Sequence, residues 1–116
     1  MARQETIIQR DMLKHIKGLG FKAVHVPNGA VLAGGPGKRA RQMNSLKADG
    51  LCVGFPDLLI YGPDGKQAHI EVKQEGGKQL ASQEAVEAWL THWGHHYAVC
   101  RSNADVTESL AEWGWI

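Results

Sequence analysis

Two carboxylates and one ammonium group stand at spacings that could build a metal-dependent hydrolytic site. Asp57 follows Pro56, and Glu71 and Lys73 lie two positions apart further along the chain. Side chains alternate along a strand, so Glu71 and Lys73 share one face with Cα atoms about 6.6 Å apart. Two carboxylates suit Mg²⁺, which prefers oxygen ligands. A lysine beside such an ion can orient a water, lower its pKa or stabilise charge on a phosphate.

A predicted hairpin brings these side chains together. Residues 58–61 and 68–73 have the apolar and β-branched character of strands, and the Gly-Pro-Asp-Gly sequence at 62–65 is typical of the turn between them. Pairing the two strands can place Asp57 against the end that carries Glu71 and Lys73. Ile70 and Val72 point to the opposite face and are expected to anchor the strand in the core.

The remaining elements predict an α/β fold in which helices cover a sheet. Apolar residues recur at helical spacing over 3–19 and 82–93, and a capped helix is predicted over 102–113. Residues 21–26 and 97–100 have the character of short strands. A basic helix with a thin apolar stripe is predicted over 38–48, after a glycine-rich approach.

A structural interpretation of the same residues stays open. Asp57 can be a turn residue at the entry to a strand, and Glu71 with Lys73 can be a solvated surface pair worth less than about 1 kcal/mol. Each of these interpretations is the stronger one for a residue taken alone. The joint placement of all three at one strand end favours the metal site.

Composition excludes several other classes of protein. The chain has 116 residues, 43% hydrophobic and 22% charged, which fits one globular domain over residues 1–116. The two cysteines are 48 positions apart and indicate neither a disulfide framework nor a zinc site. No apolar run approaches the roughly 18 residues of a membrane span. We therefore expect a protein of a reducing, cytoplasmic setting with no membrane partner.

The net charge of +1 hides a strong asymmetry along the chain. Residues 1–50 hold nine Lys/Arg and three Asp/Glu, whereas residues 51–116 hold four and nine, so the two parts carry +6 and −5. A run of basic residues is usually a solvated surface. The run in residues 38–47 follows a glycine-rich segment and precedes Asp57, and this position favours phosphate binding. The residues predicted to contact nucleic acid are Lys38, Arg39, Arg41 and Lys47.

His25 lies in the first predicted strand, and Asn28 lies in the turn that follows it. They are candidates for contact with DNA phosphate or for an approach to the metal. A strand histidine followed by a turn asparagine also has a purely structural interpretation.

Four motifs in order resemble a known nuclease family. They are VPNG at 26–29, GFPDL at 54–58, IEVK at 70–73, and the stretch from Gly77 to Ser82 and Gln83. Asp57, a spacer of thirteen residues and then Glu71-Val72-Lys73 resembles the PD-(D/E)xK signature of restriction-endonuclease-like nucleases. The whole set is similar to the virus-type replication-repair nuclease domain, VRR-NUC, over essentially the entire chain.

The resemblance implies a fold and a set of residue roles. The fold is a restriction-endonuclease-like core of order αβββαβ, with a central mixed four-stranded sheet flanked by helices. Asp57, Glu71 and the main-chain carbonyl of Val72 would hold Mg²⁺ or Mn²⁺, and Lys73 would position or activate the attacking water. Glu5 in the first helix would bind a water on the metal or a second ion. Gln83 would orient Lys73 or a metal ligand.

The implied activity is structure-specific cleavage of DNA. A metal-dependent endodeoxyribonuclease acting on branched or junction DNA is expected, with a Holliday-junction resolvase of a bacterial or phage-infected cell as one candidate. Small members that stand alone resemble symmetric homodimers, which would put two sites on two strands. Two alternatives remain: a branched-DNA-binding module whose catalysis has lapsed, and an RNA-processing nuclease of the same fold.

Overall fold

The computed structural model describes residues 3–27 and 32–116. The predicted contact residue Asn28 lies outside this part of the chain. Within it, four helices and four strands follow in this order: α1 (Arg3–Gly18), β1 (Lys22–His25), α2 (Pro36–Ala48), β2 (Leu58–Tyr61), β3 (Gln67–Val72), α3 (Ala81–His92), β4 (His96–Cys100) and α4 (Asn103–Glu112).

The strands form one mixed sheet in the order β1-β2-β3-β4. β1 pairs with β2 and β2 with β3 in antiparallel fashion, and β4 runs parallel to β3. A parallel neighbour needs a crossover connection, which α3 supplies. In this register Leu58 lies opposite Ile70, and Val72 lies opposite Cys100. The predicted α/β fold with a mixed four-stranded sheet is therefore confirmed.

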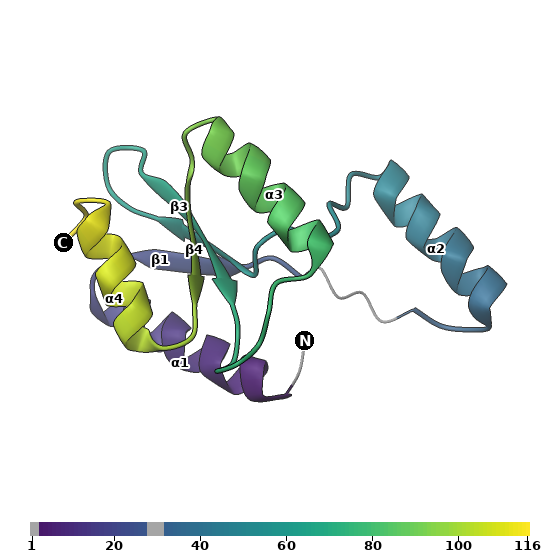
Figure 1. The fold of residues 1–116 in the computed structure, drawn as a ribbon, viewed down its shortest axis with the longest axis horizontal. Helices are drawn as coiled ribbons and strands as arrows, with labels where there is room; N and C mark the ends of the chain where they lie inside the picture. The colour runs from purple at the N-terminus through teal and green to yellow at the C-terminus, as the bar shows by residue number, and fades with distance from the viewer. Residues whose placement is uncertain (1–2, 28–31) are drawn as a thin grey trace.

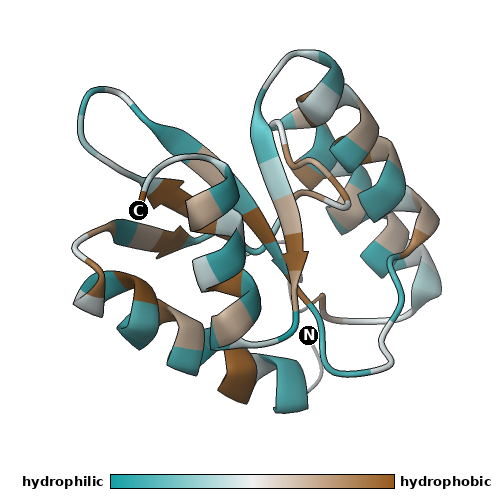
Figure 2. Cartoon of the chain, turned by 60° about the vertical axis from the view of Figure 1, so that its left-hand side comes forward, coloured by the Kyte–Doolittle hydropathy of each residue, from teal (hydrophilic) through white to brown (hydrophobic). Residues whose placement is uncertain are grey.

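Helices cover both faces of the sheet. α1 and α4 pack against each other, and the apolar side chains that they bury form one cluster with Ile70 and Val72 of β3 (Figure 1). α3 covers the face of the sheet on which Glu71 lies, and its buried side chains are Val86 and Leu90. Figure 2 shows hydrophobic segments in the strands and an alternation of hydrophobic and hydrophilic segments along the helices. The alternation along β3 thus separates the core face from the face of Glu71.

α2 departs from this layered arrangement. Its proline stands at the start of the helix, where a missing N–H is tolerated. None of its residues is buried, and within the described residues no Cα atom of α2 comes within 8 Å of another helix or strand. Figure 1 shows it projecting from the body, and the radius of gyration of 15.1 Å exceeds the about 13 Å expected for a compact chain of this length. We call residues 32–51, which contain α2, the arm.

Among the residues that the structure describes, no helix is long and apolar enough to cross a bilayer.

Candidate active site

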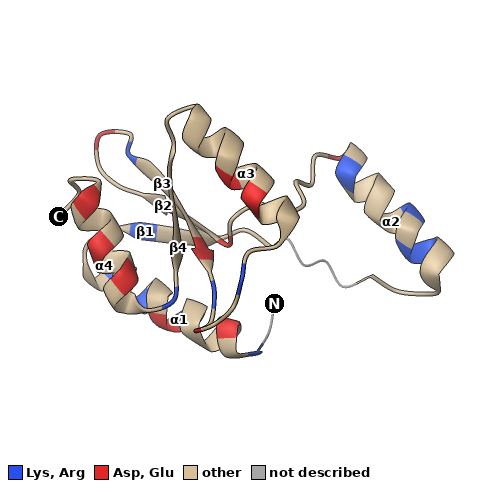
Figure 3. Ribbon diagram, in the orientation of Figure 1, with Lys and Arg blue, Asp and Glu red and all other residues tan. Residues whose placement is uncertain are grey.

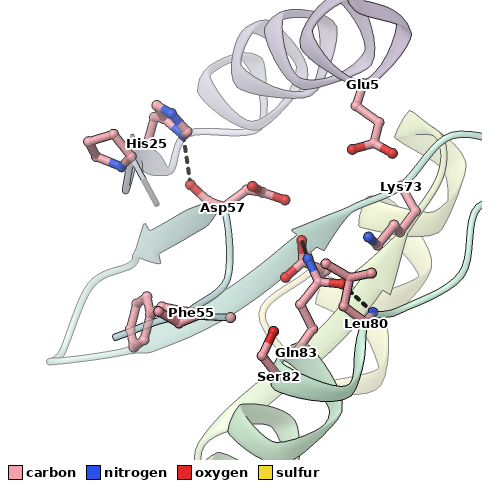
Figure 4. Close-up of a pocket in the computed structure, with 12 residues that line it drawn as sticks. Glu5, His25, Phe55, Asp57, Lys73, Leu80, Ser82 and Gln83 are labelled. Carbon is pink, nitrogen blue, oxygen red and sulfur yellow. Dashed lines mark hydrogen bonds between the residues drawn. The ribbon is translucent and has the colours of Figure 1, made fainter. Parts of the chain in front are cut away.

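A pocket of about 380 Å³ opens where the carboxyl end of β3 meets the first turns of α1 and α3 (Figure 4). All five side chains predicted to be catalytic line it, together with His25. The full lining is Glu5, His25, Pro27, Val53, Gly54, Phe55, Asp57, Glu71, Lys73, Leu80, Ser82 and Gln83. The fold therefore brings into one cavity residues that are up to 78 positions apart in the sequence, from Glu5 to Gln83.

Asp57 is held at both its side chain and its main chain. It directly precedes β2, and the antiparallel register puts it beside the end of β3. Its Oδ2 atom accepts a hydrogen bond from the Val72 N–H at 2.8 Å. Its main-chain oxygen accepts from the Val26 N–H at 2.8 Å and from His25 Nδ1 at 3.0 Å. The carboxylate thus has a defined place before any ligand binds.

Glu71 and Lys73 are buried, so the alternative of a solvated surface pair is wrong. Glu71 is only 1% exposed and Lys73 only 6%. The Oε2 atom of Glu71 is buried without a hydrogen-bond partner among the described residues. Burial raises the pKa of Glu71 to about 9, and the neighbouring carboxyl of Asp57 adds to the shift. A buried oxygen of this kind is expensive unless a proton or a cation satisfies it.

Gln83 is oriented by the backbone at the start of α3. Leu80 occupies the N-cap position and has no side-chain acceptor, and the Gln83 Oε1 atom accepts from its N–H at 2.8 Å. Because that oxygen is engaged, the amide nitrogen faces the other way and donates to Glu71 Oε1 at 3.3 Å. Of the two roles predicted for Gln83, the structure shows a contact with the predicted metal ligand Glu71.

Glu5 lies on the first turn of α1 and faces the pocket (Figure 4). Its negative charge is the smallest of the influences that raise the pKa of Glu71. Within the described residues no three Asp, Glu, His or Cys side chains group closely enough to hold an ion by themselves. The predicted ligand set uses only two side chains with the carbonyl of Val72, and a metal role for Glu5 stays a prediction.

The chemistry of the donors fits a hard divalent cation. Asp57 and Glu71 supply carboxylate oxygens, and the unpartnered Glu71 Oε2 atom is the kind of atom that such an ion satisfies. Lys73 adds a positive charge in the same pocket. The arrangement can polarise a phosphoryl oxygen, hold a water near it and stabilise the developing charge.

Some pocket residues carry no role in the sequence interpretation. Gly54 belongs to the GFPDL motif, and its φ of +87° and closeness to α3 explain the glycine: an added Cβ would lie 2.4 Å from the Ser82 carbonyl oxygen. Val53 and Leu80 are exposed apolar residues on the lining. Leucine is rare at an N-cap position, and this is the feature of the sequence that could have drawn attention to Leu80.

His69 shares a face of β3 with Glu71 but does not line the pocket. Its side chain is buried, and its ring lies edge-on to Phe55 with centroids 5.7 Å apart. Its Nδ1 atom donates to the His96 carbonyl oxygen at 3.1 Å. Burial lowers the pKa of His69. His69 therefore supports Phe55 from behind the pocket wall.

The predicted DNA-contacting residues on α2 lie outside the pocket but are linked to it. Pocket-lining residues flank the arm in the sequence: His25 and Pro27 come before it, and Val53 and Gly54 come after it. Figure 3 shows Lys and Arg on α2 and acidic residues on α3 and α4. The exposed basic residues of the arm are Lys38, Arg39, Arg41 and Lys47.

Comparisons with known proteins identify the family and the fold of this chain. The model of the VRR-NUC domain matches residues 4–104. A solved structure described as a VRR_NUC domain superposes with a TM-score of 0.65 at 22% identity, covering 96% of this chain and 97% of that one. Another, described as a VRR_NUC domain protein, gives 0.66 at 18% identity, covering 97% and 88%. These identities show the shared fold. No curated protein matched. With a family model that spans most of its length, this chain belongs to the VRR-NUC family of nuclease domains.

Proposed function

We propose that this nuclease domain is a metal-dependent endonuclease that hydrolyses phosphodiester bonds in branched DNA. The observation that carries the proposal is the buried pair Asp57 and Glu71, with an unpartnered Glu71 oxygen and Lys73 in the same pocket. A carboxylate buried in this way destabilises the metal-free protein, which is a recurring feature of functional sites. A cation held there and an anionic substrate beside it explain all three residues.

Asp57, Glu71 and the Val72 carbonyl would hold Mg²⁺ or Mn²⁺, with Glu5 placed to hold a water or a second ion. When bound, the ion supplies Lewis-acid polarisation of the phosphate and a lowered pKa for the attacking water. Lys73 orients that water and stabilises negative charge on the phosphate as the water oxygen bonds to phosphorus. The bond to the 3′ oxygen breaks, and that oxygen leaves protonated. The products are a 5′-phosphate and a 3′-hydroxyl.

The neighbours of the two carboxylates maintain this geometry. The Val72 N–H donates to Asp57, and the Gln83 amide donates to the Oε1 atom of Glu71. Partners that fix a ligand in this way typically change metal affinity by about 10- to 100-fold when removed.

The arm is the proposed DNA-binding element. Its four basic side chains are exposed, and they lie on a helix that has no buried residue. Contacts with phosphates would fix the orientation of the DNA and carry little sequence information. A homodimer is part of the proposal, since two copies would present two pockets to the two strands of a junction.

A cleavage panel tests the proposed function. Purified protein with Mg²⁺ or Mn²⁺ is offered linear, flap, fork and four-way DNA, and matched RNA and hybrid substrates. We expect cutting of branched DNA by the wild type and at least a 100-fold slower reaction for Lys73→Ala, because the stabilising charge is removed. Equal rates for the two proteins would overturn the assigned site. Tight binding without cleavage in every metal would establish a lapsed module, and preferential cutting of RNA would establish an RNA nuclease.

A further inference from the structure

We propose that Leu80 and Val53 form an apolar rim that contacts unstacked bases next to the scissile phosphate and so selects branched DNA over continuous duplex. The proposal rests on the proposed function and adds the residues that determine substrate choice. Both side chains line the pocket that holds Asp57 and Glu71, and both face solvent, with Leu80 64% and Val53 44% exposed.

Leu80 has no evident structural role at its position. It stands at the N-cap of α3, where Ser, Thr, Asp or Asn usually accepts a hydrogen bond from the helix. It provides no such acceptor and buries little of its surface. Gln83 instead satisfies the N–H of Leu80. Neither capping nor packing accounts for a leucine here, whereas a ligand in the pocket does.

A close backbone approach joins the two segments that carry these apolar residues. Gly54 approaches α3 so closely that its Cβ position lies 2.4 Å from the Ser82 oxygen and 2.8 Å from the Gln83 nitrogen. Val53 adjoins this glycine and Leu80 lies two residues before Ser82. Figure 4 shows Leu80 beside Ser82 and Gln83, on the wall of the pocket that α3 provides. The rim is thus a preformed feature with little freedom to move away.

The chemistry of this rim selects bases rather than phosphates. An aliphatic surface gains nothing from a hydrated phosphate, and the arm already supplies cations for that purpose. The faces of nucleobases are apolar, and contacts with them tolerate any sequence. In continuous duplex those faces are stacked and hidden, and exposing them is least costly where the bases are already unpaired. Apolar side chains placed against such steps are a known way of holding distorted DNA.

The decisive variant is Leu80→Ser, which removes the apolar contact and installs a favourable N-cap residue. We expect an unchanged or higher melting temperature and a fall of about tenfold in the ratio of kcat/KM for four-way junction to kcat/KM for continuous duplex. A factor of this size corresponds to the transfer free energy of a leucine side chain. Val53→Ser should lower the same ratio by a smaller factor.

Trp93→Ser is the matched control, because Trp93 caps the other end of α3, is 67% exposed and does not line the pocket. It should keep the wild-type ratio. As a second readout, 2-aminopurine at the branch point, with Ca²⁺ in place of Mg²⁺, should report less perturbation of the base by Leu80→Ser than by wild type. A wild-type ratio in Leu80→Ser, or an equal fall in Trp93→Ser, would overturn the inference. Absence of cleavage of any DNA by the wild type would instead overturn the proposed function.

Discussion

The carboxylate of Glu71 lies in surroundings that disfavour its charge when no cation is bound. It is buried on β3, Asp57 lies beside it, and one of its oxygens has no hydrogen-bond partner among the described residues. Lys73 acts in the opposite direction, favouring the charged form, but burial is the largest influence. These surroundings are the ones expected of a residue that binds a cation, as the proposed metal site requires.

The raised pKa of Glu71 predicts how the stability of the metal-free protein depends on pH. The folded protein keeps the Glu71 proton to about pH 9, whereas the unfolded chain loses it near the ordinary value of 4.5. The contribution of Glu71 to the free energy of unfolding is fully present below pH 4.5 and is lost as the pH rises toward 9. Glu71→Gln should thus unfold at a higher temperature than wild type at pH 8 in EDTA, and the two should converge near pH 5. Melting curves over this range are the measurement.

Glu71→Gln removes both a buried ionisable group and a proposed metal ligand, and a measurement with Mn²⁺ distinguishes the two effects. An ion that binds only the folded protein raises the melting temperature, so Mn²⁺ should stabilise the wild type at pH 8 and leave Glu71→Gln unaffected. Parallel pH curves for the two proteins, or equal stabilisation by Mn²⁺, would contradict the role assigned to Glu71.

At the scale of elements, the site depends on how the segment before β2 meets α3. Gly54 has a positive φ and sits against the Ser82 carbonyl, so this contact sets the spacing between Asp57 and the first turn of α3. Gln83 then reaches Glu71 from that turn. The carboxylates are thereby positioned by two backbone segments as well as by the hairpin.

Gly54→Ala should disturb both stability and the site. An added Cβ meets backbone atoms that cannot rotate away, so we expect a loss of roughly 2–4 kcal/mol in the free energy of unfolding, more than the 1–3 kcal/mol typical of a strained φ alone. Gly65→Ala is the control, because Gly65 also has a positive φ but its Cβ would meet nothing within 4 Å. Urea unfolding and Mn²⁺ titration of both variants measure the difference. Equal losses in the two proteins would show that the contact with Ser82 is unimportant.

At the scale of the whole molecule, the proposed DNA-binding arm is expected to add little to the stability of the fold. Short isolated helices are marginal in water, and α2 has no buried residue and no Cα atom within 8 Å of another described helix or strand. Its basic side chains give the arm a charge opposite to that of the acidic second half of the chain. A phosphate backbone beside the pocket is the partner that this charge fits.

Replacing the four basic residues of the arm by glutamine should therefore weaken DNA binding without lowering the melting temperature. If each contacts one phosphate, the slope of log K against log salt should decrease by about 3.6, at roughly 0.9 per contact. Lys14→Gln with Lys17→Gln on α1 is the control, which should keep the wild-type slope. Binding titrations at several salt concentrations measure it, and an unchanged slope would exclude the arm as the phosphate-binding element. The replaced residues are Lys38, Arg39, Arg41 and Lys47.

The sequence by itself determined the elements and the chemical composition of the site. The alternation along 70–73 put Glu71 and Lys73 on one face, and the turn at 62–65 brought Asp57 to that end of the hairpin. The helices and strands begin and end within a few residues of the predicted positions. These features follow from local physics, since periodicity, turn residues and strand pairing are written in neighbouring positions.

Only the tertiary structure decided what depends on distant segments. The burial of Glu71, the backbone contact of Gly54 with Ser82 and the apolar rim of Val53 and Leu80 all arise where α3 meets the loop before β2. His69 shares the face of Glu71, yet its place behind Phe55 comes from packing that no spacing reveals. The isolation of the arm is likewise invisible in its own sequence, because a helix pattern does not state which partner its surface has. Burial and close approach are properties of segments brought together from far along the chain.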